Sequence, residues 1–126
     1  MKLSVVTAMY KSERFVGPFH TALTEKAKEL TEDYEIIFVD DGSPDGSARA
    51  VEELTRSDPR VRLVKLSRNF GQSVAMLAGM RKAKGEHVYT SDIDLEDPPE
   101  LLTRFDAMMK DDPDLQSIYG FMATRK

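Results

Sequence analysis

Three acidic residues spaced two apart, Asp92, Asp94 and Glu96, follow a short apolar run in the second half of the chain. That run, His87-Val88-Tyr89-Thr90, indicates a buried strand. Because strand side chains alternate with a period of two, we expect Asp92 and Asp94 to share one side of extended backbone while Ile93 points into the core. Paired carboxylates suit Mg²⁺ or Mn²⁺, and these ions bind phosphates. Aspartates are also common in turns, so the pair alone leaves both interpretations open.

The residues after this acidic stretch indicate the start of a helix. In Asp97-Pro98-Pro99-Glu100 we expect Asp97 to be the N-cap and Pro98 the first helical residue. Glu100 would complete a capping box. Assigning Asp97 and Glu100 to this helix start leaves Asp92, Asp94 and Glu96 available for a metal ion.

The elements that must position these acids alternate regularly along the chain. β-branched and aromatic runs predict strands, and apolar residues at helical spacing predict helices. Between residues 61 and 66 apolar residues alternate with charged ones, which indicates a strand near the edge of the sheet. The order predicts an α/β fold with a doubly wound, mostly parallel sheet and helices on both faces. The expected strands are 3–7, 34–39, 61–66, 87–90 and 115–119, and the expected helices are 15–32, 48–56, 71–84 and 98–110.

Length, charge and composition exclude several classes of protein. A chain of 126 residues is long enough for one domain with a core of its own, and without cysteine it can have neither disulfides nor zinc–thiolate sites. A net charge of −4 argues against a nucleic-acid partner. No apolar run is long enough to predict a transmembrane segment or a signal peptide. We therefore expect a soluble cytoplasmic protein.

In doubly wound sheets ligands bind beyond the carboxyl ends of the strands, so the segments there carry the functional candidates. Asp40 and Asp41 end the second strand and could serve either a nucleotide or the turn. Tyr10 could stack on a base or only cover the core edge. Arg68 could meet a phosphate or remain a solvated loop residue. In the following turn, Asp45 or Ser47 is a plausible helix cap.

Together these segments resemble the inverting family 2 glycosyltransferases of the GT-A fold, in particular the branch of dolichyl- and polyprenyl-phosphate sugar transferases. The first match is Val39-Asp40-Asp41-Gly42-Ser43-Pro44-Asp45. The second is Arg68-Asn69-Phe70-Gly71, with Gly79 in the next helix. The third runs from Asp92 to Glu100. The motifs occur in the family's order and spacing from Leu3 to about Gly120.

The resemblance implies a role for each matching residue. Asp41 would bind the base or ribose, Asp92 would lie against the ribose and diphosphate, and Asp94 would coordinate Mg²⁺ or Mn²⁺. Glu96 stands where this branch usually has a glutamine that also reaches the metal. The implied metal set is Asp94, Asp92 and Glu96. The implied nucleotide-binding set is Ala8, Tyr10, Asp40, Asp41, Arg68, Asp92 and Ile93.

The implied reaction is inverting transfer of a sugar from a nucleoside-diphosphate sugar to a saccharide or lipid-phosphate acceptor such as a polyprenyl phosphate. A lipid acceptor would make the protein peripheral at the membrane. Two segments depart from the branch: the first loop lacks its usual asparagine and acid, and Met122 stands at an arginine position near Tyr119, with Arg125 beyond it. We expect residues 1–126 to be the nucleotide-sugar-binding part of a truncated GT-A domain, with no assignable catalytic residue and poor turnover.

One alternative stays open, and four are disfavoured. The chain could be a non-catalytic nucleotide-binding or interaction module left by truncation, with a homodimer covering an exposed sheet edge. A phosphoacceptor signalling domain would need an aspartate after the third strand, where this chain has Leu66-Ser67. A dinucleotide fold, a P-loop and a sugar nucleotidyltransferase would each need a glycine-rich loop that is absent here.

Overall fold

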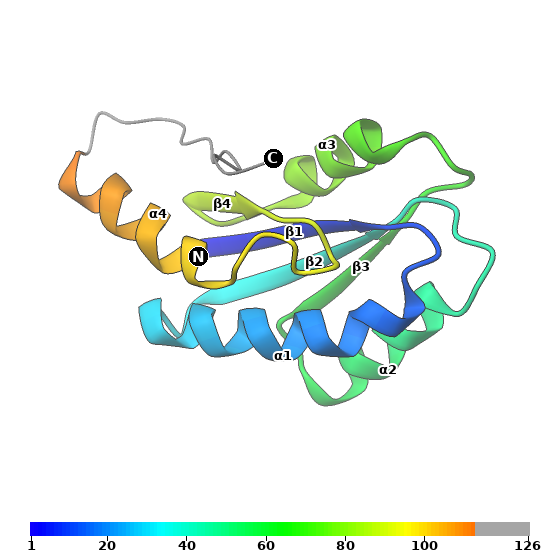
Figure 1. Cartoon of the computed structure of the whole chain (residues 1–126), viewed down its shortest axis with the longest axis horizontal. Helices are drawn as coiled ribbons and strands as arrows, with labels where there is room; N and C mark the ends of the chain where they lie inside the picture. The colour runs from blue at the N-terminus through cyan, green and yellow to red at the C-terminus, as the bar shows by residue number, and fades with distance from the viewer. Residues whose placement is uncertain (113–126) are drawn as a thin grey trace, which may run out of the picture.

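The computed structural model describes residues 1–112, which form one parallel sheet flanked by helices (Figure 1). The sheet order is β3-β2-β1-β4, so the first strand lies inside the sheet, and every neighbouring pair is parallel. The strands are β1 (Leu3–Met9), β2 (Tyr34–Asp40), β3 (Val61–Lys65) and β4 (His87–Thr90). The helices are α1 (Glu13–Leu30), α2 (Ser47–Ser57), α3 (Gln72–Lys82) and α4 (Glu100–Asp111). The expected α/β class and parallel sheet are confirmed.

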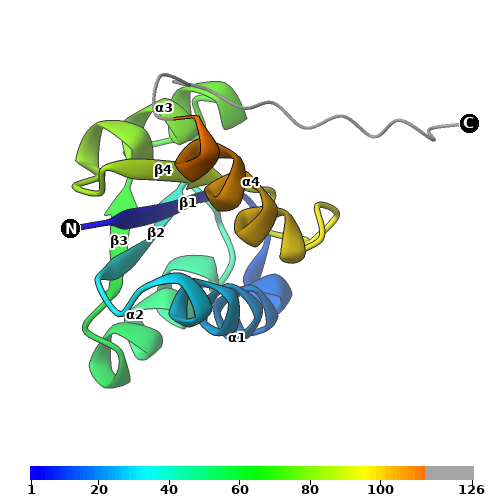
Figure 2. The same ribbon diagram turned by 90° about the vertical axis from the view of Figure 1, so that its left-hand side faces the viewer.

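Helices cover both faces of the sheet because strand side chains alternate between them. On one face, Val5 of β1 and Ile36 of β2 belong to a core that also holds buried residues of α1, α2 and α4. On the other face, Val6 and Ile37 pack with Ala75 of α3. Figure 2 shows α3 on the opposite side of the sheet from α1 and α2. The doubly wound arrangement is therefore confirmed.

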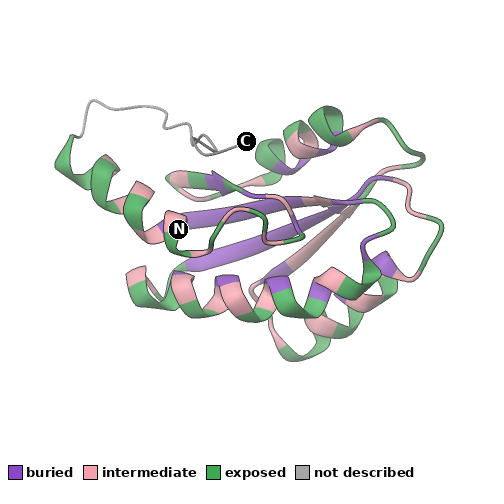
Figure 3. Cartoon of the chain, in the orientation of Figure 1, coloured by how far each residue is buried: buried purple, intermediate pink, exposed green. Residues whose placement is uncertain are grey.

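Burial is greatest in the two inner strands (Figure 3). All seven residues of β2 are buried, and only Ala8 of β1 is not. The edge position expected for residues 61–66 is confirmed, because β3 is an outer strand. The strand expected at residues 87–90 is confirmed, but the expectation that it is buried is wrong. Among the described residues β4 is the other outer strand, where Tyr89 is buried and Val88 is 40% exposed.

The start of α4 also differs from the prediction. The helix begins at Glu100 with Pro99 as N-cap, and no side chain caps it, so the roles predicted for Asp97, Pro98 and Glu100 are wrong. Two consecutive prolines lack N–H groups, and a residue that precedes proline is disfavoured in helical geometry. The N–H groups of Leu101 and Leu102 instead bond the carbonyls of Pro98 and Pro99, three residues earlier, in a tighter first turn.

The remaining elements match within a few residues at each end. The strand expected at 115–119, and with it Tyr119, Met122 and Arg125, lies outside the described residues. Within residues 1–112, no helix is both long and apolar enough to cross a membrane.

Candidate nucleotide and metal site

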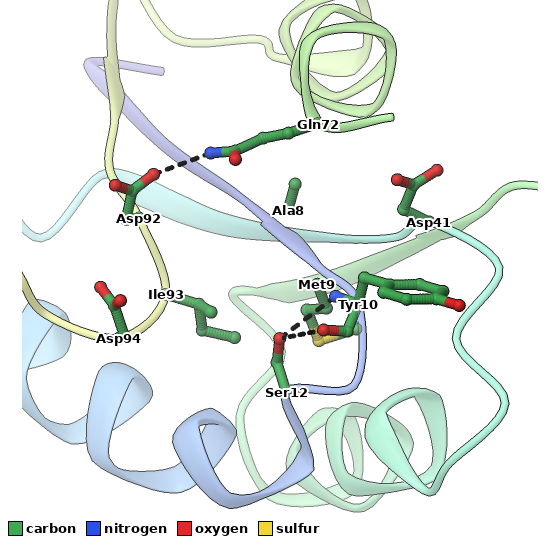
Figure 4. Close-up of a pocket in the computed structure, with 9 residues that line it drawn as sticks. All are labelled: Ala8, Met9, Tyr10, Ser12, Asp41, Gln72, Asp92, Ile93 and Asp94. Atoms are coloured by element: carbon green, nitrogen blue, oxygen red, sulfur yellow. Dashed lines mark hydrogen bonds between the residues drawn. The ribbon is translucent and has the colours of Figure 1, made fainter. Parts of the chain in front are cut away.

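A pocket opens where β1 and β4 end, at the edge of the sheet where doubly wound folds bind ligands (Figure 4). Its residues come from the end of β1, the segments that follow β1, β2 and β4, and the first turn of α3. They are Ala8, Met9, Tyr10, Ser12, Asp41, Gln72, Asp92, Ile93 and Asp94. Six of the residues expected in the site are therefore brought together: Ala8, Tyr10, Asp41, Asp92, Ile93 and Asp94.

The loop between β1 and α1 presents Tyr10 at the pocket. The Ser12 hydroxyl accepts the Tyr10 N–H at 3.1 Å and donates to its carbonyl at 3.0 Å, so the buried serine closes the turn on itself. Lys11, between them, has a φ of 55°. The Tyr10 side chain is 44% exposed. A fixed backbone with an exposed aromatic ring provides a surface on which a planar base can stack.

The loop from Ser43 to Ser47 holds this first loop in place. The N–H of Lys11 donates to the Ser43 hydroxyl at 2.8 Å, and the N–H of Ser12 donates to the Ser47 hydroxyl at 3.0 Å. The N–H of Gly46 in turn donates to Glu13 at 3.1 Å. The starts of α1 and α2 are thus joined through hydrogen bonds between residues more than thirty positions apart.

Asp45 organises that second loop. Gly46 is the N-cap of α2, while the Asp45 carboxylate accepts the N–H of Ser47, the first helical residue, at 3.0 Å. The prediction that Asp45 or Ser47 is the N-cap is therefore wrong, although Asp45 binds the first helical N–H from the position before the cap. Burial acts to raise the pKa of Asp45, but hydrogen bonds from the hydroxyls of Ser43 and Ser47, and from backbone N–H groups, lower it to about 2.

The two aspartates that end β2 have different surroundings. Asp40 is buried, and its Oδ1 accepts the Ser43 N–H at 2.9 Å, so its carboxylate serves the turn and does not line the pocket. Asp41 lines the pocket and is only 3% exposed. Its carboxylate accepts the N–H groups of Phe70 at 2.8 Å and Gly71 at 3.1 Å.

The loop before α3 lies directly against the β2 end. Asn69 donates a third hydrogen bond to the Asp41 carboxylate at 3.2 Å. Gly42 has a φ of 68°, and a Cβ there would lie 2.3 Å from the backbone carbon of Arg68, so glycine is required for the approach. Arg68 is exposed and its guanidinium lies 4.8 Å from the centre of the Phe70 ring. Its side chain does not line the pocket.

The Asp-x-Asp segment is a turn and not an extension of β4. The Leu95 N–H bonds the Asp92 carbonyl at 3.3 Å, and Leu95 has a φ of 61°. The strand-alternation argument for Asp92 and Asp94 is therefore wrong, although both residues line the pocket. Ile93 is 7% exposed and belongs to the core, as expected.

The acidic side chains fit a metal ion shared with a ligand, not one enclosed by protein alone. Within residues 1–112, no three histidine, aspartate or glutamate side chains gather closely enough to hold a metal. Glu96 does not line the pocket, and its N–H donates to Asp94 Oδ1 at 3.0 Å. Mg²⁺ is commonly bound by one or two carboxylates together with substrate phosphates and water. Asp92 and Asp94 suit that mode of binding.

Three residues of the pocket were not expected from the sequence: Met9, Ser12 and Gln72. Gln72 is the most informative, because its Nε2 donates to Asp92 Oδ1 at 2.8 Å (Figure 4). The sequence feature that could have identified Gln72 is its place directly after Gly71, at the start of a helix that follows a strand end.

The pocket thus places an aromatic ring and carboxylates beyond the carboxyl ends of a parallel sheet, where doubly wound α/β folds bind their ligands. The family model "Glycosyl transferase family 2" matches residues 4–126. The chain belongs to this family, which confirms the resemblance.

Curated relatives extend this result. The chain is 49% identical over 105 residues to a Mycobacterium tuberculosis protein described as a glycosyltransferase, covering 83% of this chain and 31% of the relative. It is 38% identical over 115 residues to an undecaprenyl-phosphate 4-deoxy-4-formamido-L-arabinose transferase of Proteus mirabilis, covering 90% of this chain and 35% of the relative. The chain thus spans about a third of the length of these relatives.

Solved structures share the fold. The mannosyltransferase PcManGT of Pyrobaculum calidifontis, in complex with GDP-Man and Mn²⁺, aligns with a TM-score of 0.76 at 23% identity over 86% of this chain and 32% of that one. Staphylococcus aureus TarS 1–349, in complex with UDP-GlcNAc, aligns with a TM-score of 0.73 at 22% identity over 99% of this chain and 39% of that one. Both support the GT-A fold predicted here.

Proposed function

We propose that this chain forms the donor site of an inverting glycosyltransferase, which binds a nucleoside-diphosphate sugar together with Mg²⁺ or Mn²⁺. The observation that carries the proposal is the single pocket that gathers Tyr10, Asp41, Asp92 and Asp94 from three strand ends. Family membership supports the reaction class, and the ligands named for PcManGT and TarS support the donor class.

The base and ribose would bind between Tyr10 and Asp41. The exposed Tyr10 ring offers a stacking face, with Ala8 beside it in the pocket. A carboxylate has about four acceptor positions. Asp41 uses three for the loop before α3, so it can still accept one hydrogen bond from a ribose hydroxyl or a base N–H. Asp40 and Arg68 would contribute to nucleotide binding without lining the pocket. Asp40 would do so by holding the turn that follows β2.

The diphosphate would lie toward Asp92 and Asp94. We assign Asp94 as the principal metal ligand, Asp92 as its neighbour against the ribose and diphosphate, and Glu96 as a third acid near the ion. When bound, a divalent ion would stabilise the negative charge that develops on the leaving diphosphate. Ile93, packed in the core between the two aspartates, fixes the turn that carries them.

The acceptor proposed is a polyprenyl phosphate, at the membrane surface. The Proteus mirabilis relative is named for that lipid carrier. A phosphate acceptor is already anionic, so the attack needs no strong general base, and none is assigned here. Because the chain spans about a third of its relatives, residues 1–126 are proposed as the nucleotide-sugar-binding part of the longer enzyme, and turnover by this chain alone would be poor.

Calorimetric titration tests the donor site. UDP and GDP are each titrated in the presence of Mn²⁺ and in the presence of EDTA, with Asp94→Asn as the site variant and the exposed Asp111→Asn of α4 as its matched control. We expect one of the nucleotides to bind in a Mn²⁺-dependent manner, and Asp94→Asn alone to weaken that binding at least tenfold. Absent or metal-independent binding by the unmodified chain would remove the proposal.

A second candidate function is nucleotide binding without sugar transfer, for which the same pocket would hold the ligand. Among residues 1–112, β3 and β4 are the outer strands of the sheet, and an outer strand can pair with a second copy, so this second function includes a homodimer. A transfer assay with a radiolabelled donor separates the two functions, and gel filtration measures the oligomeric state. Robust transfer by the 126-residue chain would refute both the second function and the expected poor turnover.

A further inference from the structure

One short segment contacts carboxylates from two different strand ends. Asn69, Phe70 and Gly71 donate to the Asp41 carboxylate, and the next residue, Gln72, donates to Asp92 at 2.8 Å. Asp41 follows β2 and Asp92 follows β4, and these strands are separated in the sheet by β1. The segment from Asn69 to Gln72 therefore spans the pocket from its Asp41 side to its Asp92 side.

We propose that Gln72 is a positioning residue that holds the Asp92 carboxylate in the orientation needed for the nucleotide and its metal ion. The inference rests on the proposed function of this pocket. Asp92 lies in a turn and is only half-buried, so the backbone does not by itself fix its side chain. Among residues 1–112, the Gln72 amide is the group that donates to this carboxylate.

The chemistry of an amide suits this role. A glutamine Nε2 donates a hydrogen bond but carries no charge, so it orients the carboxylate without neutralising it. The negative charge of Asp92 stays available to a cation, whereas a lysine or arginine at position 72 would pair with it. One Asp92 oxygen accepts from Gln72, and the other accepts no hydrogen bond from residues 1–112, which leaves it to the ligand.

The backbone of Gln72 is itself fixed from the opposite side. Gly71 has a φ of 101° and is the N-cap of α3, and its N–H is bound by Asp41 at 3.1 Å. Gln72 follows as the first residue of the helix, so both ends of the segment are held. Asp41 thereby sets the position from which Gln72 reaches Asp92, and the two sides of the pocket keep a constant separation.

Three variants test the proposal by Mn²⁺-dependent titration of UDP and GDP. Gln72→Ala removes the donor and should weaken binding about tenfold, as the loss of groups that orient metal ligands usually does. Ser73→Ala, at the next exposed position of α3, is the matched control and should bind as the unmodified chain does. Thermal unfolding midpoints should stay unchanged in both, because both side chains are exposed.

Gln72→Glu separates a hydrogen-bond donor from a side chain of the same length. A glutamate carboxylate accepts hydrogen bonds and does not donate one, and it would repel the Asp92 carboxylate. Gln72→Glu should therefore not restore the binding lost in Gln72→Ala. Binding by Gln72→Ala within twofold of the unmodified chain, or binding by Gln72→Glu equal to that of the unmodified chain, would overturn the proposal.

A measurement without ligand keeps this test separate from the proposed function. In the ligand-free protein, the side-chain amide resonances of Gln72 should shift in Asp92→Ala, as expected for a lost hydrogen bond, and should not shift in Asp111→Asn. If the unmodified chain binds no nucleotide, the proposed donor site fails. The spectrum still shows whether Gln72 donates its hydrogen bond to Asp92. Unchanged Gln72 resonances in Asp92→Ala would show that Gln72 does not hold Asp92.

Discussion

The carboxylate of Glu35 accepts a hydrogen bond from the Ser4 hydroxyl at 2.6 Å, between β2 and β1, at the end of the sheet opposite the pocket. Glu35 is only 2% exposed. It also accepts the Lys84 N–H at 2.7 Å and an Arg62 guanidinium N–H at 2.6 Å. The connection between α3 and β4 is thereby fixed to the two inner strands.

Glu35→Ala should destabilise the protein because it leaves the Ser4 hydroxyl and the Lys84 N–H without their acceptor. Buried groups deprived of a partner cost about 1–3 kcal/mol of unfolding free energy. Urea denaturation at pH 7 measures the loss. Glu25→Ala, at an exposed position of α1, is the control and should change stability by no more than about 0.5 kcal/mol. Equal stabilities of the two variants would contradict this role for Glu35.

Glu35 should also make stability depend on pH in acid. Burial acts to raise its pKa, but hydrogen bonds from Ser4, Lys84 and Arg62 bring it below the ordinary value of 4.5. A carboxyl whose folded pKa is lowered stabilises above its unfolded pKa, and this contribution is lost as pH falls through the folded pKa. The stability difference between the unmodified chain and Glu35→Gln should therefore be constant above pH 5 and shrink below pH 4. Urea midpoints of both proteins, measured from pH 7 to pH 3, check this. A difference between the two midpoints that grows in acid would refute it.

Asp45 provides a second acid-sensitive contact, beside the pocket. Its pKa of about 2 lies below the ordinary 3.8 because the hydrogen bonds of Ser43 and Ser47 outweigh its desolvation. The loop that holds Tyr10 should stay closed down to about pH 4 and loosen as pH falls toward 2. Carbon-13 NMR titration of the Asp45 carboxyl checks the value directly. A midpoint at or above 3.8 would contradict the hydrogen-bond network described.

Two helical glycines should respond differently to alanine. At Gly79 of α3 a Cβ would lie 2.5 Å from Val6 and 2.7 Å from Val39, so Gly79→Ala should push the helix off the sheet and cost about 1–3 kcal/mol. At Gly17 of α1 nothing beyond its chain neighbours lies within 4 Å, but Pro18 follows it, and a Cβ before proline is disfavoured in helical geometry. This clash opposes the gain in helix propensity, so Gly17→Ala should change stability by less than about 1 kcal/mol. Denaturation midpoints compare the two variants, and stabilisation by Gly79→Ala would show that α3 does not approach β1 as closely as described.

The sheet and its two covered faces could be predicted from the sequence, because strands that alternate with helices favour a parallel sheet with helices on both faces. Val5 and Val6, one residue apart, lie in different cores. The position of the pocket was predictable for the same reason, since parallel strands place their carboxyl ends at one edge of the sheet.

Contacts between distant segments could not be predicted in this way. Spacing within the chain does not reveal that Gln72 reaches Asp92, because that contact depends on where α3 begins relative to β4. The start of α4 was misplaced because a capping pattern that included Asp97 competed with the backbone restrictions of two prolines. The Asp92–Asp94 segment was misjudged because it turns directly after β4 ends at Thr90.

Paramagnetic broadening by Mn²⁺ tests the central claim, that the acids after β4 hold a metal ion together with a nucleoside diphosphate, most directly. With UDP or GDP present, substoichiometric Mn²⁺ should broaden the backbone amides from Asp92 to Glu96 first and Tyr10 next, while those of Arg56 and Gly85 remain sharp. The broadening should disappear in Asp94→Asn or when Mg²⁺ displaces the ion. Broadening centred elsewhere in the chain, or unchanged in Asp94→Asn, would contradict the account.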